Sequence, residues 1–285
     1  MRELDLSLVT KNVRDMLIEA CSVLDDSVIN CLKCVQKKEE SPLGKEIIGK
    51  IIENDLLAKR EMVPLCQDTG IVVAFIELGS EVYFKGDIYE AVNEGVRLAY
   101  TEGYLRKSVV EHPLHRINTK NNSPAITHIK LVPGDSVKIT VAPKGGGSEN
   151  MSLVKMLIPA DGIPGIKKLV LDTVFNAGGK PCPPIVVGLG IGGDLEKCAI
   201  MAKEALMRPI DDSSSDPYAK ELEDELLKDI NDLGVGPMGF GGRVTCLAVK
   251  VNCYPCHIAS LPVAINIQCH ACRHKEVILW VENFI

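Results

Sequence analysis

Aromatic side chains and long apolar runs are both scarce in this sequence. Phe, Trp and Tyr make up 4% of its 285 residues, so the core has to be built mainly from Val, Ile, Leu and Ala. No stretch approaches the roughly 18 uninterrupted apolar residues that a membrane-spanning helix needs. The opening segment MRELDLSLVTKNVRDML is charged and amphipathic, and it lacks the apolar core and cleavage site of a secretory signal. We therefore expect a protein without membrane contact, located in the cytoplasm.

A surplus of positive charge is missing as well. The sequence has 32 Lys and Arg against 38 Asp and Glu, a formal net charge of −6. That balance argues against a nucleic-acid-binding surface. Cysteine, in contrast, is abundant: there are 11, and without a secretion signal they indicate reduced thiols in a cytosol. So many thiols also suggest that some of them are ligands.

The hydrophobic pattern changes along the chain from helical to mixed. Residues 4 to 60 place Leu, Val and Ile at spacings of three and four, which predicts helices, with a break at Ser41-Pro42-Leu43-Gly44. Beyond them, buried strands such as GIVVAFIEL alternate with helical segments such as DIYEAVNEGVRLAYTEGYL. The segment AITHIKLVPGDSVKITVAP alternates around a Pro-Gly-Asp turn and predicts a β-hairpin. We expect a mixed α/β (α+β) fold, with a helical N-terminal region followed by a mixed sheet with flanking helices, in one compact domain over residues 1–285.

Two glycine-rich segments suggest binding loops. GLGIGGD, from Gly188 to Asp194, matches the GxGxxG dinucleotide fingerprint between a strand and a helix. A lone match is weak, however, and no acidic residue follows a second strand about twenty residues later, so a tight turn that starts a helix is the favoured explanation. In PKGGGSEN the successive glycines Gly145, Gly146 and Gly147 expose backbone N–H groups that suit a carboxylate or a phosphate.

Two late CxxC pairs have the spacing of a four-thiolate zinc site. They are Cys253 with Cys256 and Cys269 with Cys272, separated by 12 residues. A structural zinc module is therefore a competing hypothesis. Against it, the intervening HIASLPVAINIQ reads as a buried strand. A zinc site would also leave Cys66 and Cys182 without a role. Cys182 stands among prolines that fix its backbone, and a cysteine that is merely buried does not need such rigidity.

Seven segments, in order, resemble one enzyme family. They are PLCQDTG, EGYLRKS, NTKNNSPA, KGGGSEN, PCPP, FGG and SLPVAINIQCHACR. Together they are similar to class I fumarate hydratases and the related L(+)-tartrate dehydratase alpha subunits, from about residue 10 to the end of the sequence. The resemblance implies a [4Fe–4S] cluster held by Cys66, Cys182 and Cys269. The family has Asp where this sequence has Cys272, which leaves open whether Cys272 competes as a ligand or is a thiol beside the cluster.

Three thiolates rather than four would leave one iron of such a cluster open to substrate. An open iron acts as a Lewis acid that makes hydroxide a better leaving group, as dehydration of a 2-hydroxy dicarboxylate requires. The resemblance implies that Gln67 and Asp68 reach this substrate, and that Asp68 handles the proton. Its alternative role is to cap the turn before the following strand.

The resemblance also implies groups that hold the two substrate carboxylates. Arg106 matches a substrate-binding arginine of the family; taken alone, it would be a surface arginine. The Gly145–Gly147 loop would bind a carboxylate through its backbone N–H groups. His257 has the spacing of a family histidine that enters the active site of a neighbouring protomer, although a histidine at the start of a strand is as good an explanation without the family.

The family resemblance further implies a missing partner. Its single-chain members carry an additional C-terminal domain with a threonine base, two arginines and a lysine, and its two-subunit members encode that domain as a beta chain. This sequence ends sixteen residues after Cys269. We therefore expect an alpha subunit within an α2β2 assembly that acts on a small dicarboxylate. The hydration of fumarate to malate is the first candidate reaction, and the dehydration of L-tartrate to oxaloacetate is the second.

Overall fold

The computed structural model describes residues 2–280, and these fall into two compact units that are each assembled from separate segments. The first unit contains residues 2–24, 55–146 and 273–280. The second contains residues 25–54 and 147–272. Because neither unit is a continuous stretch of sequence, the expectation of a single domain over residues 1–285 stays a prediction. Within residues 2–280, no helix combines the length and the apolar character needed to cross a bilayer.

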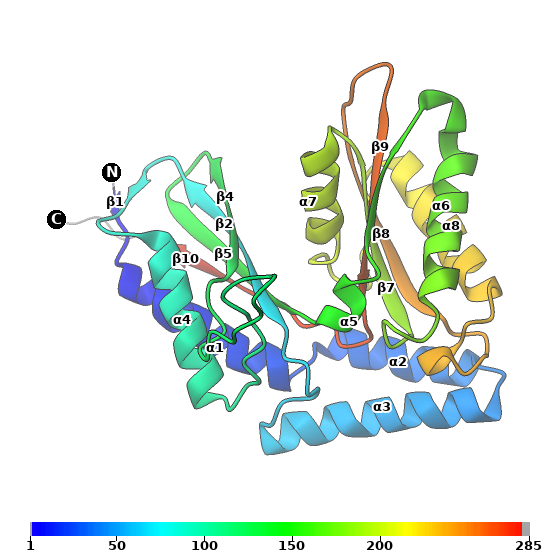
Figure 1. Ribbon diagram of the computed structural model, residues 1–285, viewed down its shortest axis with the longest axis horizontal. Coiled ribbons are helices and arrows are strands. Elements are labelled where there is room, and N and C mark those ends of the chain that lie inside the picture. Colours follow the sequence, from blue (N-terminus) through cyan, green and yellow to red (C-terminus); the bar gives the residue numbers. More distant parts are fainter. Residues whose placement is uncertain (1, 281–285) are drawn as a thin grey trace. The chain divides into compact units, whose positions relative to one another are not determined.

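The first unit is a four-stranded sheet with helices on one face (Figure 1). Its strands are β2 (Ile71–Gly79), β4 (Ile126–Val132), β5 (Ser136–Lys144) and β10 (Lys275–Trp280), in the order β10-β5-β2-β4. β2 and β4 are parallel, and the other pairs are antiparallel. Helices α1 (Leu6–Ser22) and α4 (Ile88–Glu102) pack together on the sheet. A small parallel pair, β1 (Arg2–Glu3) with β3 (Val82–Tyr83), lies outside this sheet.

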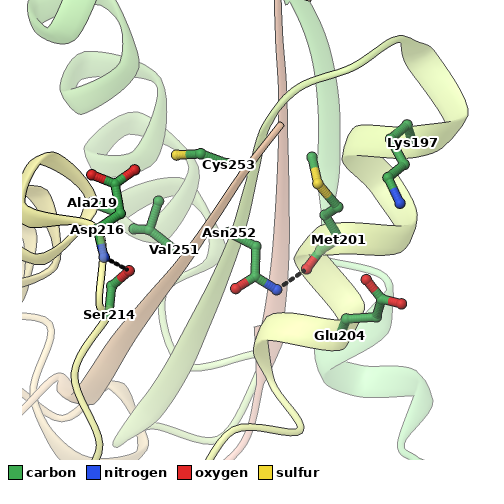
Figure 2. Close-up of a pocket in the computed structure, with 9 residues that line it drawn as sticks. All are labelled: Lys197, Met201, Glu204, Ser214, Asp216, Ala219, Val251, Asn252 and Cys253. Atoms are coloured by element: carbon green, nitrogen blue, oxygen red, sulfur yellow. Dashed lines mark hydrogen bonds between the residues drawn. The ribbon is translucent and has the colours of Figure 1, made fainter. Parts of the chain in front are cut away.

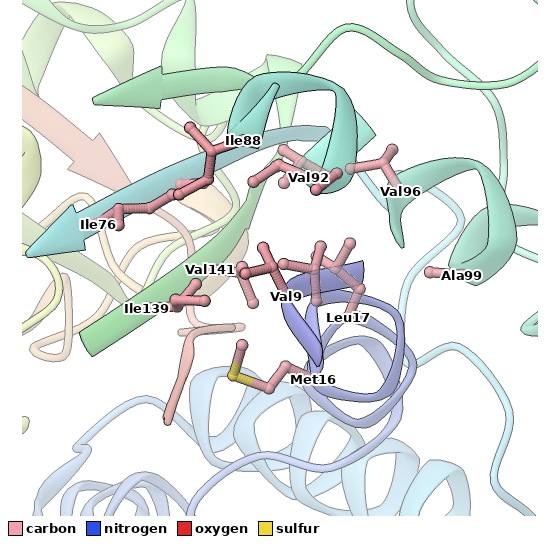
Figure 3. Close-up of a cluster of buried hydrophobic side chains, with 14 of the residues drawn as sticks. Val9, Met16, Leu17, Ile76, Ile88, Val92, Val96, Ala99, Ile139 and Val141 are labelled. Atoms are coloured by element: carbon pink, nitrogen blue, oxygen red, sulfur yellow. The ribbon is translucent and has the colours of Figure 1, made fainter. Parts of the chain in front are cut away.

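The core of this unit follows from the spacing of its apolar residues. Helix α1 begins after Asp5, whose carboxylate accepts from the Ser7 amide, and it buries residues at helical spacing that include Val9 and Leu17. These side chains meet Val92 of α4 and Ile139 of β5 (Figure 3). Burial of this aliphatic cluster provides the main stabilising free energy of the unit, as the scarcity of aromatic residues requires.

The predicted hairpin is wrong in its pairing, although both of its strands exist. β4 and β5 flank the Pro-Gly-Asp turn as expected, but each pairs with β2, which lies between them. The turn therefore passes across the end of β2. Gly79 makes this possible, because a Cβ there would lie 2.5 Å from the carbonyl oxygen of Gly134. Local alternation predicted the strands but carried no information about a third strand between them.

The second unit is also built on a four-stranded sheet, covered on both faces (Figure 1). Its strands are β6 (Leu153–Leu157), β9 (Leu261–Gln268), β7 (Ile185–Gly192) and β8 (Cys246–Tyr254), in that order. β7 and β8 are parallel, whereas β9 is antiparallel to β7 and to β6. Helices α6 (Gly162–Ala177) and α8 (Pro217–Asp232) cover one face, and α7 (Leu195–Ala205) covers the other.

Shorter elements complete the second unit and lead into the first. Helix α2 (Asp26–Lys38) is followed by α3 (Pro42–Glu61), whose last turns belong to the first unit. The one-turn helix α5 (Gly146–Glu149) lies at the boundary between the units, and the 3₁₀ turns η1 (Pro159–Asp161) and η2 (Pro237–Gly239) are connections. The break between α2 and α3 falls at residues 39–41, next to the predicted Ser41–Gly44 break.

The GxGxxG segment is explained by packing. Gly188 and Gly190 lie in β7 and face helix α7, where added Cβ atoms would lie 2.2 Å and 2.0 Å from backbone oxygens of that helix. Gly192 and Gly193 then adopt positive φ angles of 91° and 67° in the turn before α7. Each glycine therefore has a structural reason, and none of these observations points to a nucleotide.

The predicted fold class is confirmed: helices come first, and strands mixed with helices follow. Four strands within residues 2–280 were not predicted: β1, β3, β6 and β10. β1 and β3 have two residues each, β6 carries a lysine in its middle, and β10 begins with Lys275-Glu276, so none shows the sustained apolar pattern of a buried strand.

Candidate functional site

The segment Cys66–Gly70 is a tight, internally bonded loop between α3 and β2. The amide of Asp68 donates to Cys66 Sγ at 3.4 Å, and the amide of Gly70 donates to Asp68 Oδ1 at 3.0 Å. Gly70 has a φ of 77°, and a Cβ there would lie 2.6 Å from the backbone of Lys144, so only glycine fits. Cys66–Gly70 therefore forms a defined turn before β2.

Buried side chains from other elements hold the backbone carbonyls of this loop. The Arg273 guanidinium donates to the carbonyl of Asp68 at 2.7 Å. The Tyr100 hydroxyl lies 2.6 Å from the carbonyl oxygen of Thr69 and 3.0 Å from that of Gly70. Both side chains are almost fully buried, at 3% and 1% exposure. The loop backbone is thus fixed, whereas Gln67 in its middle is exposed to solvent.

The Asp68 carboxylate meets the glycine loop that follows β5. Its second oxygen, Oδ2, accepts from the amide of Gly146 at 2.8 Å. An added Cβ on Gly145 would lie 3.2 Å from Asp68 Oδ2 and 3.5 Å from Arg273 Nη2. A carboxylate and a buried guanidinium therefore both lie against Gly145. The Gly146 amide, predicted to bind a substrate carboxylate, is bonded to Asp68 in this structure.

Arg106 lies on an exposed loop that is bonded to the same segment. The hydroxyl of Thr69 donates to the Arg106 carbonyl at 2.9 Å, and the Arg106 side chain is exposed. Its backbone is consequently anchored beside Cys66–Gly70 while its guanidinium is available to solvent. In the first unit the structure thus brings together Cys66, Gln67, Asp68, Arg106, Gly145 and Gly146.

Cys182 and Cys269 belong to the second unit and lie at the same end of its sheet. Cys182 comes three residues before β7, and Cys269 directly follows β9. Because Val186 of β7 pairs with Gln268 of β9, the antiparallel register brings the two segments to one edge. Cys182 also has a φ of 57°, an uncommon conformation for a residue with a side chain and one that often marks functional positions.

Cys272 differs from Cys269 in its surroundings. Its thiol is buried, and Sγ lies 3.8 Å from the Cys269 carbonyl oxygen, whereas the Cys269 thiol is half-buried and 3.7 Å from the Gln268 amide nitrogen. Burial raises the pKa of the Cys272 thiol well above its ordinary value, and the neighbouring Cys269 adds to this. The two thiols thus differ in accessibility, Cys269 being the more accessible, and which of them holds a cluster stays a prediction.

The zinc hypothesis is contradicted by the topology of the second unit. Cys253 pairs with Ile191 near the end of β7, while Gln268, next to Cys269, pairs with Val186 near its start. Five residues of β-strand separate these positions by about 17 Å. A zinc ion holds its sulfur ligands about 4 Å apart. Because β8 is parallel and β9 antiparallel to β7, the two CxxC pairs lie at opposite ends of the sheet.

Cys253 lines a cavity of about 320 Å³ instead (Figure 2). The cavity lies between α7 and α8, and it is lined by polar groups that include Lys197, Glu204, Asp216 and Asn252. The side-chain amide of Asn252 is already bonded to the carbonyl of Met201 at 3.2 Å. This cavity is separate from the residues that the sequence analysis singled out at the Cys269 end of the sheet.

His257 lies on the exposed connection between β8 and β9, far from Cys269 in its own chain. Its Nδ1 accepts from the amide of Ala259 at 3.1 Å. The whole length of β9, from Leu261 to Gln268, separates the two residues by about 23 Å. A role for His257 beside the cysteine of the same chain is thereby excluded. Its role in a neighbouring protomer stays a prediction, and so does the alternative of a structural histidine at the start of a strand.

Across residues 2–280, no group of three or more His, Cys, Asp or Glu side chains is arranged to hold a metal ion. Cys66 belongs to the first unit, and Cys182 and Cys269 belong to the second. Gly147 begins the second unit, and an added Cβ there would lie 3.3 Å from the Lys180 carbonyl oxygen, two residues before Cys182.

Sequence reasoning missed the side chains that support the site. Arg273 and Asn122 are part of the quoted CHACR and NTKNNSPA segments, but nothing in those segments alone says which backbone groups they bind. Tyr100 had no signal, because an isolated tyrosine in a helical pattern is typical of core packing.

Comparison with known proteins agrees with the motifs. The family model described as Fumarate hydratase (Fumerase) matches residues 10–278. A protein of Methanocaldococcus jannaschii described as "Putative L(+)-tartrate dehydratase subunit alpha" is 46% identical over 268 residues, which cover 92% of this chain and 94% of that protein. The L(+)-tartrate dehydratase subunit alpha of Escherichia coli K12 is 30% identical over 260 residues, covering 90% and 86%. The chain therefore belongs to the fumarate hydratase (Fumerase) family, whose members include L(+)-tartrate dehydratase alpha subunits.

Proposed function

We propose that this chain is the alpha subunit of a [4Fe–4S]-dependent hydro-lyase that adds water to, or removes it from, a C4 dicarboxylate. Membership of the family supports hydro-lyase chemistry. The observation that carries the proposal is the Cys66–Gly70 loop: a half-buried thiol, an exposed amide and a carboxylate are presented side by side on a backbone fixed by Arg273 and Tyr100.

The donor set in this chain fits an iron–sulfur cluster. Thiolates are its usual ligands, and the sulfur of Cys66 accepts a backbone N–H while that of Cys269 lies near an amide nitrogen, both of which stabilise negative charge on sulfur. We propose Cys66, Cys182 and Cys269 as the ligands. When bound through only three cysteines, the cluster supplies an open iron that acts as a Lewis acid on the hydroxyl of the substrate.

The remaining residues bind the substrate and handle its proton. Gln67, exposed in the middle of the loop, would donate to the substrate beside Cys66. Asp68 would accept or deliver a proton at its Oδ2 atom, once substrate displaces the Gly146 amide from that oxygen. The released amide of Gly146 and those of Gly145 and Gly147 would then bind a substrate carboxylate. The guanidinium of Arg106 would bind the other carboxylate through paired N–H donors.

The chain would need a partner to form the complete site. The relatives are named alpha subunits, which supports a beta subunit that supplies further substrate and base groups. The exposure of His257, at the end of the sheet opposite Cys269, supports its predicted entry into the site of a neighbouring protomer in an α2β2 assembly. We keep a cytoplasmic location as part of the proposal, because eleven cysteines suit a reducing compartment.

The two candidate substrates are fumarate and L-tartrate. Fumarate hydration is the first candidate from the motifs, while the names of the relatives favour L-tartrate. Both are C4 dicarboxylates, so the same pair of carboxylate-binding positions serves either one. The test is a panel of hydroxy-acids assayed without oxygen, using the alpha chain purified together with its co-expressed beta partner.

Cysteine variants test the cluster itself. Cys182→Ser should abolish the broad visible absorbance and the turnover of the anaerobically prepared complex. Cys253→Ser, a matched control at the other end of the same sheet, should leave both unchanged. A colourless wild-type complex, or a Cys182→Ser complex that keeps its colour, would contradict the proposal. Iron and sulfide analysis of the same samples separates cluster loss from unfolding.

A further inference from the structure

Two buried side chains without an assigned role tie the Arg106 loop to the Cys66–Gly70 segment. The Thr69 hydroxyl donates to the Arg106 carbonyl at 2.9 Å. The Asn122 carbonyl oxygen accepts from the amides of Ser108 at 2.6 Å and Val109 at 3.2 Å. The Asn122 amide nitrogen donates to the Gly70 carbonyl at 3.1 Å. One asparagine therefore bonds to both segments at once.

Both side chains are placed where they can fix the backbone. Thr69 is 1% exposed and Asn122 is fully buried, so their hydrogen bonds do not compete with water. Asn122 also adopts a φ of 61°, a left-handed conformation that asparagine tolerates better than most residues. Lys120, two residues earlier, has a φ of 63°. A segment held in such conformations requires surrounding contacts that stabilise it.

The result is a contrast between a fixed backbone and an accessible side chain. The carbonyl of Arg106 and the amides two and three residues later are bonded to buried groups, while the Arg106 guanidinium is exposed. The anchor point of the guanidinium is thus set relative to Cys66 and Asp68, within the same unit.

We propose that Thr69 and Asn122 are positioning residues that set where Arg106 presents its guanidinium to one substrate carboxylate. This inference rests on the proposed function, because it takes Arg106 as a carboxylate-binding group. Neither residue touches the substrate. Their effect is to make the distance between Arg106 and the Cys66–Asp68 segment suit a short dicarboxylate.

The expected effect falls on binding rather than on the chemical step. A carboxylate held by Arg106 is bound equally in the substrate complex and in the transition state, so weaker positioning raises KM and leaves kcat nearly unchanged. One neutral hydrogen bond corresponds to a factor of about five in an equilibrium constant. We therefore expect KM to rise about fivefold when the Thr69 bond is removed.

Thr69→Val is the first test, in the complex with the beta partner. Valine keeps the shape of threonine and removes the hydroxyl. Thr69→Ser keeps the hydroxyl and should restore a KM within twofold of wild type. Thr10→Val is the matched control, since the Thr10 hydroxyl makes an equally long bond, 2.9 Å, to the carbonyl of Ala91 elsewhere in the unit. It should lower stability similarly without changing KM. A rise in KM for Thr10→Val, or a fall in kcat alone for Thr69→Val, would overturn the proposal.

The Arg106→Ala variant tests whether the effect of Thr69 on KM depends on the Arg106 guanidinium. If Thr69 acts by positioning Arg106, Thr69→Val should change KM by less than twofold once the guanidinium is gone. A full fivefold effect in that background would mean that Thr69 acts on the site directly, which would refute the inference.

Hydrogen exchange gives a readout that does not depend on activity. Asn122→Gly is compatible with the left-handed φ and removes all three bonds. The amides of Ser108 and Val109 should then exchange at least fivefold faster, while core amides of β2 remain unchanged. Unchanged exchange at Ser108 and Val109 would refute the positioning role. A wild-type complex without turnover would instead contradict the proposed function, and the exchange result would still decide whether Asn122 fixes the loop.

Discussion

The Oδ2 atom of Asp68 accepts a hydrogen bond of 2.8 Å from the amide of Gly146, 78 residues further along the chain. This contact joins two of the three segments for which the sequence predicted substrate binding, the third being the Arg106 loop. It also means that the carboxylate and the amide satisfy each other in the absence of a ligand. An incoming carboxylate would replace Asp68 on that amide, so substrate binding and the availability of Asp68 for proton transfer would be linked.

Asp68→Asn distinguishes proton handling from turn capping. If Asp68 transfers a proton, turnover should fall about 100-fold or more while the cluster absorbance is kept. Asp87→Asn is the matched control, because Asp87 caps α4 in the same unit by accepting from the amides of Tyr89 and Glu90. Because asparagine caps a helix about as well as aspartate, it should change stability by no more than about 0.5 kcal/mol and leave turnover unchanged. If Asp68→Asn behaves like Asp87→Asn, Asp68 is a cap.

Cys272→Ser should leave the cluster in place. The Cys272 thiol is buried and is close to the Cys269 carbonyl, whereas Cys269 is the more accessible of the two. We expect the variant complex to retain its visible absorbance and its iron content, while Cys269→Ser loses both. Loss of iron from Cys272→Ser, in protein that melts at the wild-type temperature, would make Cys272 a ligand and answer the question that the sequence left open.

Glu39 predicts a pH-dependent loss of stability. Its Oε1 atom accepts from the amides of Glu40, Ser41 and Arg243, and Oε2 accepts from Val244. Burial alone would raise the pKa of Glu39, but these hydrogen bonds outweigh it and lower the pKa below its ordinary value of 4.5. The stabilisation is therefore present above pH 4.5 and is lost as the pH falls through the lower, folded-state pKa.

Glu39→Gln should lower the free energy of unfolding at pH 7 by about 2 kcal/mol, because a charged acceptor is replaced by a neutral amide. Denaturant titrations at several pH values measure this, and the difference from wild type should shrink below pH 4.5. Glu40→Gln is the control: Glu40 is exposed and makes only a 3.4 Å ion pair with Arg243, so the change should stay within about 0.5 kcal/mol. Equal losses in both variants at pH 7 would contradict the assignment.

Gly190→Ala tests whether the GxGxxG segment is a packing motif. A Cβ at Gly190 would lie 2.0 Å from the carbonyl oxygen of Cys198, so helix α7 has to shift, and we expect a loss of about 3 kcal/mol. Gly234→Ala provides the comparison. Gly234 has a φ of 71° and open space around it, so only backbone strain of about 1 kcal/mol is expected. A Gly190→Ala protein as stable as Gly234→Ala would remove the packing explanation.

Local sequence patterns predicted where helices and strands lie better than they predicted which strands pair with each other. The apolar run Ile71–Gly79 and the helix over Ile88–Glu102 were recognisable because each has a clear period. The pairing of β4 and of β5 with β2 was not recognisable, because local alternation does not show that a third strand lies between them. Likewise, two CxxC pairs at a zinc-like spacing could not reveal that β8 and β9 run in opposite directions.

The site residues show the same division. Cys66, Asp68 and the glycine loop were predicted as site residues because their motif is specific, and the structure shows Asp68 and Gly146 in contact. Four supporting residues were not assigned roles, because they act on backbone atoms of residues 13 to 205 positions away: Thr69, Tyr100, Asn122 and Arg273. Contacts of that separation depend on the tertiary fold and leave no periodic trace in the sequence.

The discontinuous make-up of the first unit has a consequence for biosynthesis. Strand β10 and Arg273 are the last described parts of the chain, yet β10 pairs with β5 and Arg273 holds the carbonyl of Asp68. On the ribosome, the Cys66–Gly70 loop therefore emerges long before the residue that anchors it. A nascent chain would have to keep that loop unfinished until Arg273 and β10 have emerged, which would delay any assembly step that requires the completed loop.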